Sequence, residues 1–137
     1  MAATYRAEDW IGRTATRRVR ITEEMVDRFL ELSGDHFASH VSHAGARAEG
    51  FRARVVHGML LGTLLTSMLD ELPGKPGVEH ETKLTFRNPA HPGDEIVIEL
   101  AVTEFFESVQ TLVLRATISR SGDDVTLATG EIQFGLR

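Results

Sequence analysis

Two side chains that can exchange protons, Asp35 and His40, stand five residues apart in the chain. A glycine, Gly58, follows within a Val-His-Gly-Met stretch at the predicted start of an apolar helix. A carboxylate and an imidazole can act together as general base and acid, and histidine changes charge close to neutral pH. The N–H of a glycine at a helix start can stabilise negative charge on a carbonyl oxygen. The sequence therefore predicts Asp35, His40 and Gly58 as catalytic groups.

Each of these residues also has an ordinary structural interpretation. Asp35 could cap a helix or close a turn, and His40 could be a loop or core histidine. His57, next to Gly58, is interpreted as a structural residue that holds the start of the helix. Only the combination of an acid, an imidazole and a helix start favours catalysis over these alternatives.

A metal site is the competing interpretation of the same stretch. Asp35, His36, His40 and His43 offer oxygen and nitrogen ligands at close spacing. No predicted helix clearly holds these four side chains on one face, and the acid–base interpretation already accounts for two of them. We therefore expect no metal, and we expect His36 and His43 to face solvent.

Two helices must position these groups. Thr22 can cap a helix that ends at Gly34, just before Asp35. Residues 35–58 have little periodicity and predict a loop with a short helix near 44–49. Residues 59–72 are apolar almost all the way round, which predicts a buried main helix, stopped by the Pro-Gly-Lys-Pro-Gly run at 73–77. Small residues on one side of this helix would let a sheet, a partner or a substrate approach closely; they are Gly62, Thr63, Thr66, Ser67 and Asp70.

Alternating segments predict strands at 17–21, 82–87, 95–103, 111–119 and 125–134. The adjacent pair Phe105-Phe106 breaks the alternation and predicts a bulge or bend. Residues 1–16 are expected to form a loosely docked N-terminal segment. A long helix followed by an antiparallel meander is an α+β fold in which the sheet covers the helix. Such a sheet leaves edge strands open, so we expect a homodimer.

Composition limits the classes of function. At 137 residues, the chain is expected to be one domain over 1–137. A net charge of −5 argues against a general nucleic-acid binder. The absence of cysteine excludes disulfides and thiolate metal sites. We find neither a signal peptide nor an apolar run of roughly 18 residues, so we expect a cytoplasmic protein without membrane contact.

Residues 32–69 resemble the (R)-specific enoyl-CoA hydratases, the MaoC-like dehydratases of the hotdog fold. The Ser-Gly-Asp sequence, the histidine five residues on and the Val-His-Gly-Met-Leu stretch match that family in order and spacing. The resemblance continues more weakly through the Leu-Pro-Gly at 72–74, the Leu-Thr-Phe at 84–86 and the Pro-Gly-Asp-Glu-Ile at 92–96. It covers roughly residues 17–137.

The resemblance implies a hotdog fold and reversible hydration of trans-2-enoyl thioesters to (R)-3-hydroxyacyl thioesters, a hydro-lyase reaction of fatty acid metabolism. It implies Asp35 and His40 as the catalytic pair, and Gly58 as the residue whose N–H polarises the thioester carbonyl. It also implies a supporting role for the Thr66 hydroxyl near the acid. Phe37 and Met59 are the remaining predicted substrate-binding residues. No cofactor is expected beyond the coenzyme A or acyl carrier protein that the substrate carries.

The chain departs from the family pattern at two places. Phe37 and Ala38 replace the usual Asn-Pro, and Arg54 stands where a proline is common. The first departure keeps open a non-catalytic acyl-thioester binding module. A hotdog thioesterase is a further alternative, although residues 62–67 lack the carboxylate or amide that it typically needs. Four arginines could meet coenzyme A phosphates or an acidic carrier protein, although surface charges need no such role: Arg47, Arg52, Arg54 and Arg87.

Overall fold

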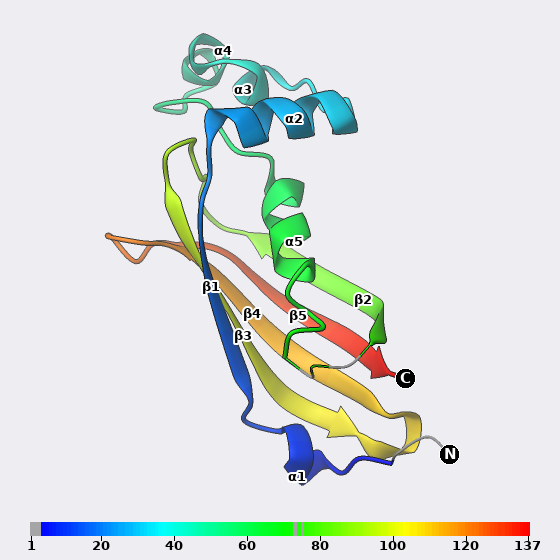
Figure 1. Cartoon of the computed structure of the whole chain (residues 1–137). Coiled ribbons are helices and arrows are strands. Elements are labelled where there is room, and N and C mark those ends of the chain that lie inside the picture. Colours follow the sequence, from blue (N-terminus) through cyan, green and yellow to red (C-terminus); the bar gives the residue numbers. More distant parts are fainter. Residues whose placement is uncertain (1–3, 73, 75) are drawn as a thin grey trace.

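A single antiparallel sheet is the framework of the structure (Figure 1). The computed structural model describes residues 4–72, 74 and 76–137. Within those residues, five strands follow the order β1-β3-β4-β5-β2 across the sheet. The strands are β1 (Thr14–Arg20), β2 (Gly77–Phe86), β3 (Glu95–Phe106), β4 (Thr111–Arg120) and β5 (Thr126–Leu136). The helices are α1 (Ala7–Trp10), α2 (Glu23–Ser33), α3 (Ala38–Val41), α4 (His43–Ala48) and α5 (Gly58–Thr66), with a 3₁₀ turn, η1 (Glu107–Val109).

The sheet curves around α5, and their shared interface is the hydrophobic core (Figure 1). The alternating apolar residues of β3 and β4 all point into it, as predicted: Ile96, Ile98, Leu100, Val102, Leu112, Leu114, Ala116 and Ile118. Leu61 and Leu65 of α5 meet them from the other side. The predicted α+β arrangement, a sheet around a central helix, is confirmed.

The strands lie where the alternation predicts them, but β1 begins three residues earlier, β3 ends three residues later and β2 begins five residues earlier than predicted. The register of β3 against β4 shifts between Val102 and Glu104, slightly before the predicted Phe105-Phe106 irregularity. After the shift, Phe105 is buried and Phe106 is half exposed. At the sheet edge, β2 begins at Gly77, well before the predicted 82. Its first half is largely exposed and polar, so an edge strand there shows no alternation.

The main helix is shorter than predicted. It ends at Thr66 rather than at residue 72, and turns follow it. The hydroxyl of Ser67 donates to the Leu64 carbonyl at 2.6 Å. A side-chain hydroxyl thus competes with backbone N–H groups for a carbonyl of the last helical turn. Beyond it the chain makes tighter backbone bonds, such as Met68 N–H to the Leu65 carbonyl at 3.0 Å. Of the predicted stop at 73–77, residues 73 and 75 lie outside the described part.

The N-terminal segment is docked, not loose, over its described residues. Trp10 is only 2% exposed and contacts Tyr5 edge-on, with ring centroids 5.1 Å apart. The guanidinium of Arg13 lies 4.5 Å from the centre of the Trp10 ring. Strand β1 then begins at Thr14 and pairs with β3. The expectation for residues 1–16 was therefore wrong from Tyr5 onward, because the segment supplies a core aromatic and a sheet edge.

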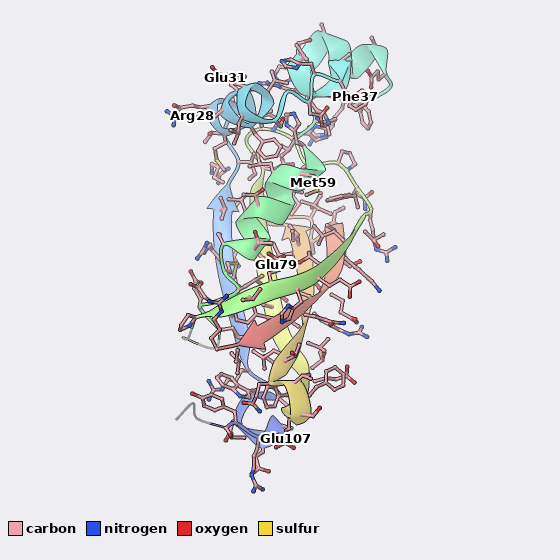
Figure 2. All side chains as sticks on the ribbon, turned by 90° about the vertical axis from the view of Figure 1, so that its right-hand side faces the viewer. Arg28, Glu31, Phe37, Met59, Glu79 and Glu107 are labelled. Atoms are coloured by element: carbon pink, nitrogen blue, oxygen red, sulfur yellow. The ribbon has the colours of Figure 1, made fainter. Side chains whose placement is uncertain are left out.

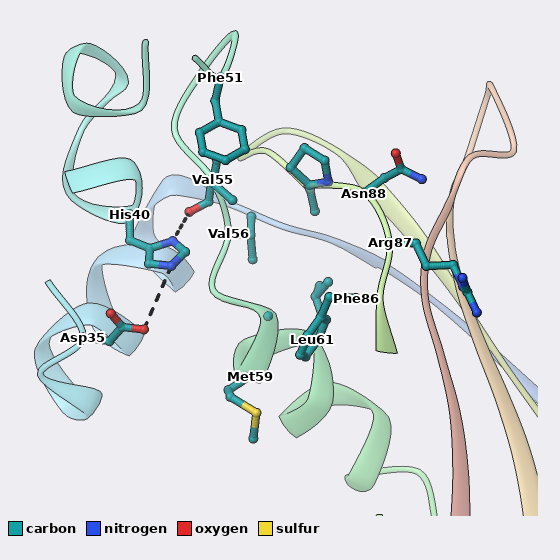
Figure 3. A pocket seen from close by; sticks show the side chains of 13 residues that line it. Asp35, His40, Phe51, Val55, Val56, Met59, Leu61, Phe86, Arg87 and Asn88 are labelled. Carbon is teal, nitrogen blue, oxygen red and sulfur yellow. Dashed lines mark hydrogen bonds and ion pairs between the residues drawn. The ribbon is translucent and has the colours of Figure 1, made fainter. Parts of the chain in front are cut away.

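Helices α2, α3 and α4 form a layer beyond one end of the sheet (Figure 1). The predicted ends of α2 are confirmed: the Thr22 hydroxyl accepts from Met25 N–H at 3.1 Å, and Gly34 has a left-handed φ of 71°. The short helix expected near 44–49 is α4, while α3 was not predicted. Asp35 and His40 lie in this layer, beside the start of α5 (Figure 3).

Candidate active site

Asp35 and His40 face each other across a short gap (Figure 3). Asp35 follows the left-handed Gly34 that ends α2, and His40 lies on α3. The distance from Asp35 Oδ2 to His40 Nε2 is 4.0 Å. That separation is too long for a direct hydrogen bond, but one water molecule can bond to both atoms. The structure thus brings the predicted acid–base pair together.

A backbone carbonyl fixes the orientation of the His40 ring. Its Nδ1 lies 2.8 Å from the Val55 carbonyl oxygen, which can only accept, so Nδ1 carries a hydrogen (Figure 3). In the neutral imidazole, the lone pair is then on Nε2, the atom that faces Asp35. The ring is held ready to accept a proton on the side of the gap.

His57 supports both members of the pair. Its ring stacks on that of His40 with centroids 4.1 Å apart and an angle of 19° between the planes. Its Nε2 donates to the Asp35 carbonyl oxygen at 3.0 Å. Burial lowers the pKa of His57, and the nearby His40 and Arg54 charges act in the same direction. His57 is also the N-cap residue of α5, directly before its first residue.

Gly58 opens α5 and lines the same cavity as the pair. The first N–H groups of a helix have no acceptor within the helix and point out of its start. A side chain at this position would collide with a neighbour, because an added Cβ would lie 2.9 Å from the ring of Phe86. A glycine therefore keeps both the backbone and the Phe86 ring in place.

A cavity of about 470 Å³ lies between the Asp35–His40 pair and the end of β2 on the opposite wall (Figure 3). This volume is within the usual range for small-molecule sites. Its walls are mostly apolar, and Asp35 and His40 lie at one side. The other lining residues are Phe51, Val55, Val56, Gly58, Met59, Leu61, Phe86, Arg87, Asn88, Pro89 and Ala90.

The three predicted substrate-binding residues lie in different places within one chain. Met59 lines the cavity. Phe37 lies outside it and is 72% exposed, above Met59 in Figure 2. The Thr66 hydroxyl donates to the Thr63 carbonyl at 3.1 Å, and Thr66 lines a separate cavity between α5 and β2. Within a single chain, Thr66 and Phe37 thus do not line the cavity that Asp35 shares with His40 and Gly58. Phe37 lines a separate pocket next to it, with Gly34, Asp35 and His36.

Arg54 is a buried part of the site, not a surface arginine. It is only 4% exposed, and its Nη1 pairs with Glu23 at 2.8 Å and Asp27 at 2.7 Å. Burial alone would lower the pKa of Arg54, but the hydrogen bonds to these two carboxylates raise it overall. The expectation that Arg54 could meet a phosphate was therefore wrong. Arg87, in contrast, is exposed and lines the cavity, and Arg47 and Arg52 are exposed elsewhere.

The four ligands of the predicted metal alternative do not gather. His36 Nδ1 bonds to the Gly34 carbonyl, and His43 Nε2 bonds to Glu23 at 2.7 Å. His57 takes their place, since one ligand atom each from Asp35, His40 and His57 lie within 4.8 Å of one another. The Nε2 of His57, however, already carries the hydrogen that it donates to the Asp35 carbonyl. Within this cluster, His57 is thus hydrogen-bonded to the Asp35 backbone and stacked on His40, while its Nδ1 is, among the described atoms, buried without a hydrogen-bond partner.

Sequence reasoning missed two groups that hold His40. One is the Val55 carbonyl, which no sequence pattern can reveal. The other is the side chain of Arg54, whose Nε donates to the His40 carbonyl at 2.7 Å. A charged residue directly before the apolar pair Val55-Val56 was the one available signal that Arg54 is buried.

Comparison with known proteins agrees with the geometry. Residues 7–122 match the family model described as MaoC like domain. The chain is 33% identical to an (R)-specific enoyl-CoA hydratase of Aeromonas caviae over 122 residues, 88% of this chain and 90% of the relative. It is 30% identical to a 3-hydroxybutyryl-CoA dehydratase of Methylorubrum extorquens over 118 residues, 85% of this chain and 74% of that relative.

Solved structures show the same fold. An (R)-hydratase from A. caviae involved in PHA biosynthesis superposes with a TM-score of 0.87 at 32% identity, covering 93% of this chain and 96% of that one. An unliganded R-hydratase from Pseudomonas aeruginosa gives a TM-score of 0.83 at 25% identity, over 92% of this chain and 81% of that one. The predicted hotdog fold is confirmed, and the chain belongs to the MaoC-like domain family.

Proposed function

We propose that the protein is a hydro-lyase that adds water reversibly to trans-2-enoyl thioesters and forms (R)-3-hydroxyacyl thioesters. The observation that carries the proposal is the Asp35–His40 pair, 4.0 Å apart, in one cavity with Gly58 at the start of α5. The names of the A. caviae and M. extorquens relatives support the same reaction. The two directions of this reaction are hydration and dehydration.

In the proposed mechanism, one water bridges Asp35 and His40. The lone pair on His40 Nε2 accepts a proton from this water while the Asp35 carboxylate accepts a hydrogen bond from its other hydrogen. The water oxygen bonds to C3 of the alkene, and the electron pair of the C2–C3 double bond moves onto the thioester oxygen. The N–H of Gly58 stabilises that oxygen, a contact whose removal typically costs about 10²–10³ in rate. The proton on His40 then passes to C2, so both parts of water add from one face.

No cofactor takes part in this proposal, because the conjugated thioester already activates the alkene. Coenzyme A or an acyl carrier protein enters only as part of the substrate. Among the described residues, no helix is long and apolar enough to span a membrane. A cytoplasmic location is proposed from the cysteine-free composition.

We also propose that the chain works as a homodimer. Strands β1 and β2 are the edges of the sheet, and an open edge favours pairing with a second copy. Large apolar side chains are exposed near the site, including Phe37, Met59 and Phe86. A second copy would cover them. Light scattering that gives twice the chain mass would support the dimer, and a monomer mass would contradict it.

An assay with crotonyl-CoA separates the three candidate activities. Loss of the enoyl-thioester absorbance, with (R)-3-hydroxybutyryl-CoA as product, supports hydration. Release of free thiol without hydration would instead identify a thioesterase. Binding of crotonyl-CoA with neither reaction would identify a binding module and contradict the proposal.

A further inference from the structure

One buried cation in the site is not used by the proposed chemistry. Of the arginines in residues 4–72, 74 and 76–137, Arg54 alone is buried. It lies in the segment between α4 and α5, beside Val55, whose carbonyl holds the His40 ring. A buried guanidinium is costly unless its donors are satisfied. The hydrogen bonds and ion pairs of Arg54 must therefore offset this cost.

The contacts of Arg54 join the elements that carry the two catalytic candidates. Its Nε donates to the carbonyl of His40 on α3 at 2.7 Å. Its Nη1 contacts Glu23 and Asp27, both on α2, at 2.8 and 2.7 Å. Asp35 follows the last turn of α2 after Gly34. One rigid planar group thus spans from the helix that leads to Asp35 to the helix that carries His40.

The backbone around Arg54 strengthens the same connection. Arg54 N–H donates to His43 Nδ1 at 3.1 Å, and His43 Nε2 donates to Glu23 at 2.7 Å. The Arg54 carbonyl accepts from His91 Nδ1 at 2.8 Å. The backbone of Arg54 is therefore fixed by hydrogen bonds on both sides. A fixed backbone allows the Arg54 side chain to hold α2 and α3 in place.

Stability alone is a weak explanation for this arrangement. Buried ion pairs typically contribute little net stability, because desolvation offsets their attraction. Among the described atoms, Arg54 Nη2 is also buried without a hydrogen-bond partner, a further cost. The guanidinium of Arg54, with its fixed arrangement of N–H donors, is better suited to positioning two helices relative to each other. It holds three acceptors on two helices at fixed separations, which a lysine ammonium cannot do equally well.

Resting on the proposed function, we propose that Arg54 is a positioning residue that sets the spacing of Asp35 and His40 by tying α3 to α2. Misplacing a catalytic group by about 1 Å can lower a rate about 10²-fold. Replacing Arg54 is therefore expected to lower kcat about 10- to 100-fold. The KM for crotonyl-CoA should change little, because Arg54 does not line the cavity.

The test compares Arg54→Gln and Arg54→Lys with Arg28→Gln as matched control. Arg28 pairs with Glu24 on the exposed face of α2, with 78% of its side chain exposed. Rates are measured well below the melting temperature of each variant. We expect a lower kcat at nearly constant KM for Arg54→Gln, partial recovery in Arg54→Lys, and wild-type kinetics in the control. Asp27→Asn weakens the same connection at a 64% exposed side chain and serves if Arg54→Gln does not fold.

A second readout does not depend on activity. The NMR signal of the His40 ring is identified by its loss in His40→Gln, and it should shift in Arg54→Gln or Asp27→Asn but not in Arg28→Gln. A lowered kcat with an unchanged His40 signal would overturn the proposal, as would a wild-type kcat in Arg54→Gln. If the wild-type protein does not hydrate crotonyl-CoA, the proposed function fails, and the His40 signal alone then decides whether Arg54 positions the ring.

Discussion

The rings of His40 and His57 are stacked, with centroids 4.1 Å apart and planes 19° apart. The two rings have different surroundings. His57 is buried and donates to the Asp35 carbonyl, whereas His40 faces the cavity. Two positive charges in this stack would repel each other, and burial already lowers the pKa of His57. Both effects favour the neutral form of His57 beside His40.

This neutrality predicts a pH dependence of stability. The pKa of His57 lies below its ordinary value of 6.5 in the folded protein. Well above pH 6.5 the residue is neutral in both the folded and unfolded states. As the pH falls below that value, the unfolded chain binds a proton that the folded protein does not, so the free energy of unfolding decreases. One such residue contributes a slope of at most about 1.4 kcal/mol per pH unit.

Urea unfolding at pH 7.5, 6.5 and 5.5, for wild type and His57→Gln, measures that slope. The wild-type protein should lose more stability than the variant between pH 6.5 and 5.5. The four histidines outside the His40–His57 stack are present in both proteins, so their contributions cancel in the comparison. Equal losses would show that His57 does not resist protonation in the folded state.

Gly58→Ala tests the space around residue 58 without removing its backbone N–H donor. The variant keeps the N–H, but its Cβ would lie 2.9 Å from the Phe86 ring and displace that ring within the cavity. We expect the KM for crotonyl-CoA to rise about tenfold, equivalent to roughly 1.4 kcal/mol of lost binding. Phe86→Leu in the Gly58→Ala background should restore part of it. A KM that stays at the wild-type value would show that the ring moves without consequence.

Arg87 offers a test of phosphate recognition. It is exposed and lines the cavity. A hydrogen bond to a charged group is worth about 1.5–3 kcal/mol, so Arg87→Gln should raise the KM for crotonyl-CoA about tenfold or more. The KM for crotonyl-N-acetylcysteamine, which lacks the phosphates, should not change. Equal effects on both substrates would contradict a phosphate contact.

Trp10→Ala tests the docking of the N-terminal segment. Removing a buried tryptophan typically costs about 3–5 kcal/mol, and Trp10 is 2% exposed. The neighbouring Ile11 is 51% exposed, so Ile11→Ala should cost less than about 0.5 kcal/mol. Chemical unfolding of both variants makes the comparison. A small loss for Trp10→Ala would mean that the segment is loosely attached after all.

Local patterns were enough to predict the central strands of the sheet and the ends of α2. The strand order differs from the predicted meander, because β2 pairs with β5 and not with β3. Alternation identified β3 and β4, since each buries one face. The capping residues Thr22 and Gly34 set the ends of α2 by contacts within a few residues. The early end of α5 was missed, because apolar periodicity continues past Thr66 while the hydroxyl of Ser67 competes for a helix acceptor. The firm docking of the N-terminal segment was not predicted, because Phe105, which Trp10 contacts, is distant in sequence.

The site was predictable only in part, because contacts that form only in the folded protein orient its residues. The spacing of Asp35, His40 and Gly58 carried the chemistry, and the structure brings these three residues to one cavity. The groups that orient them could not be predicted. The Val55 carbonyl is backbone, and Arg54 looks like any surface arginine until the fold buries it.

The most direct test measures kcat/KM for crotonyl-CoA hydration in wild type, Asp35→Asn, His40→Gln and the double variant, each shown to be folded by circular dichroism. Groups that act as one unit are strongly non-additive. We predict that each single variant loses about 10³-fold or more and that the double variant loses little beyond that. Full hydration activity in either single variant would contradict the assignment of Asp35 and His40 as the pair that activates water.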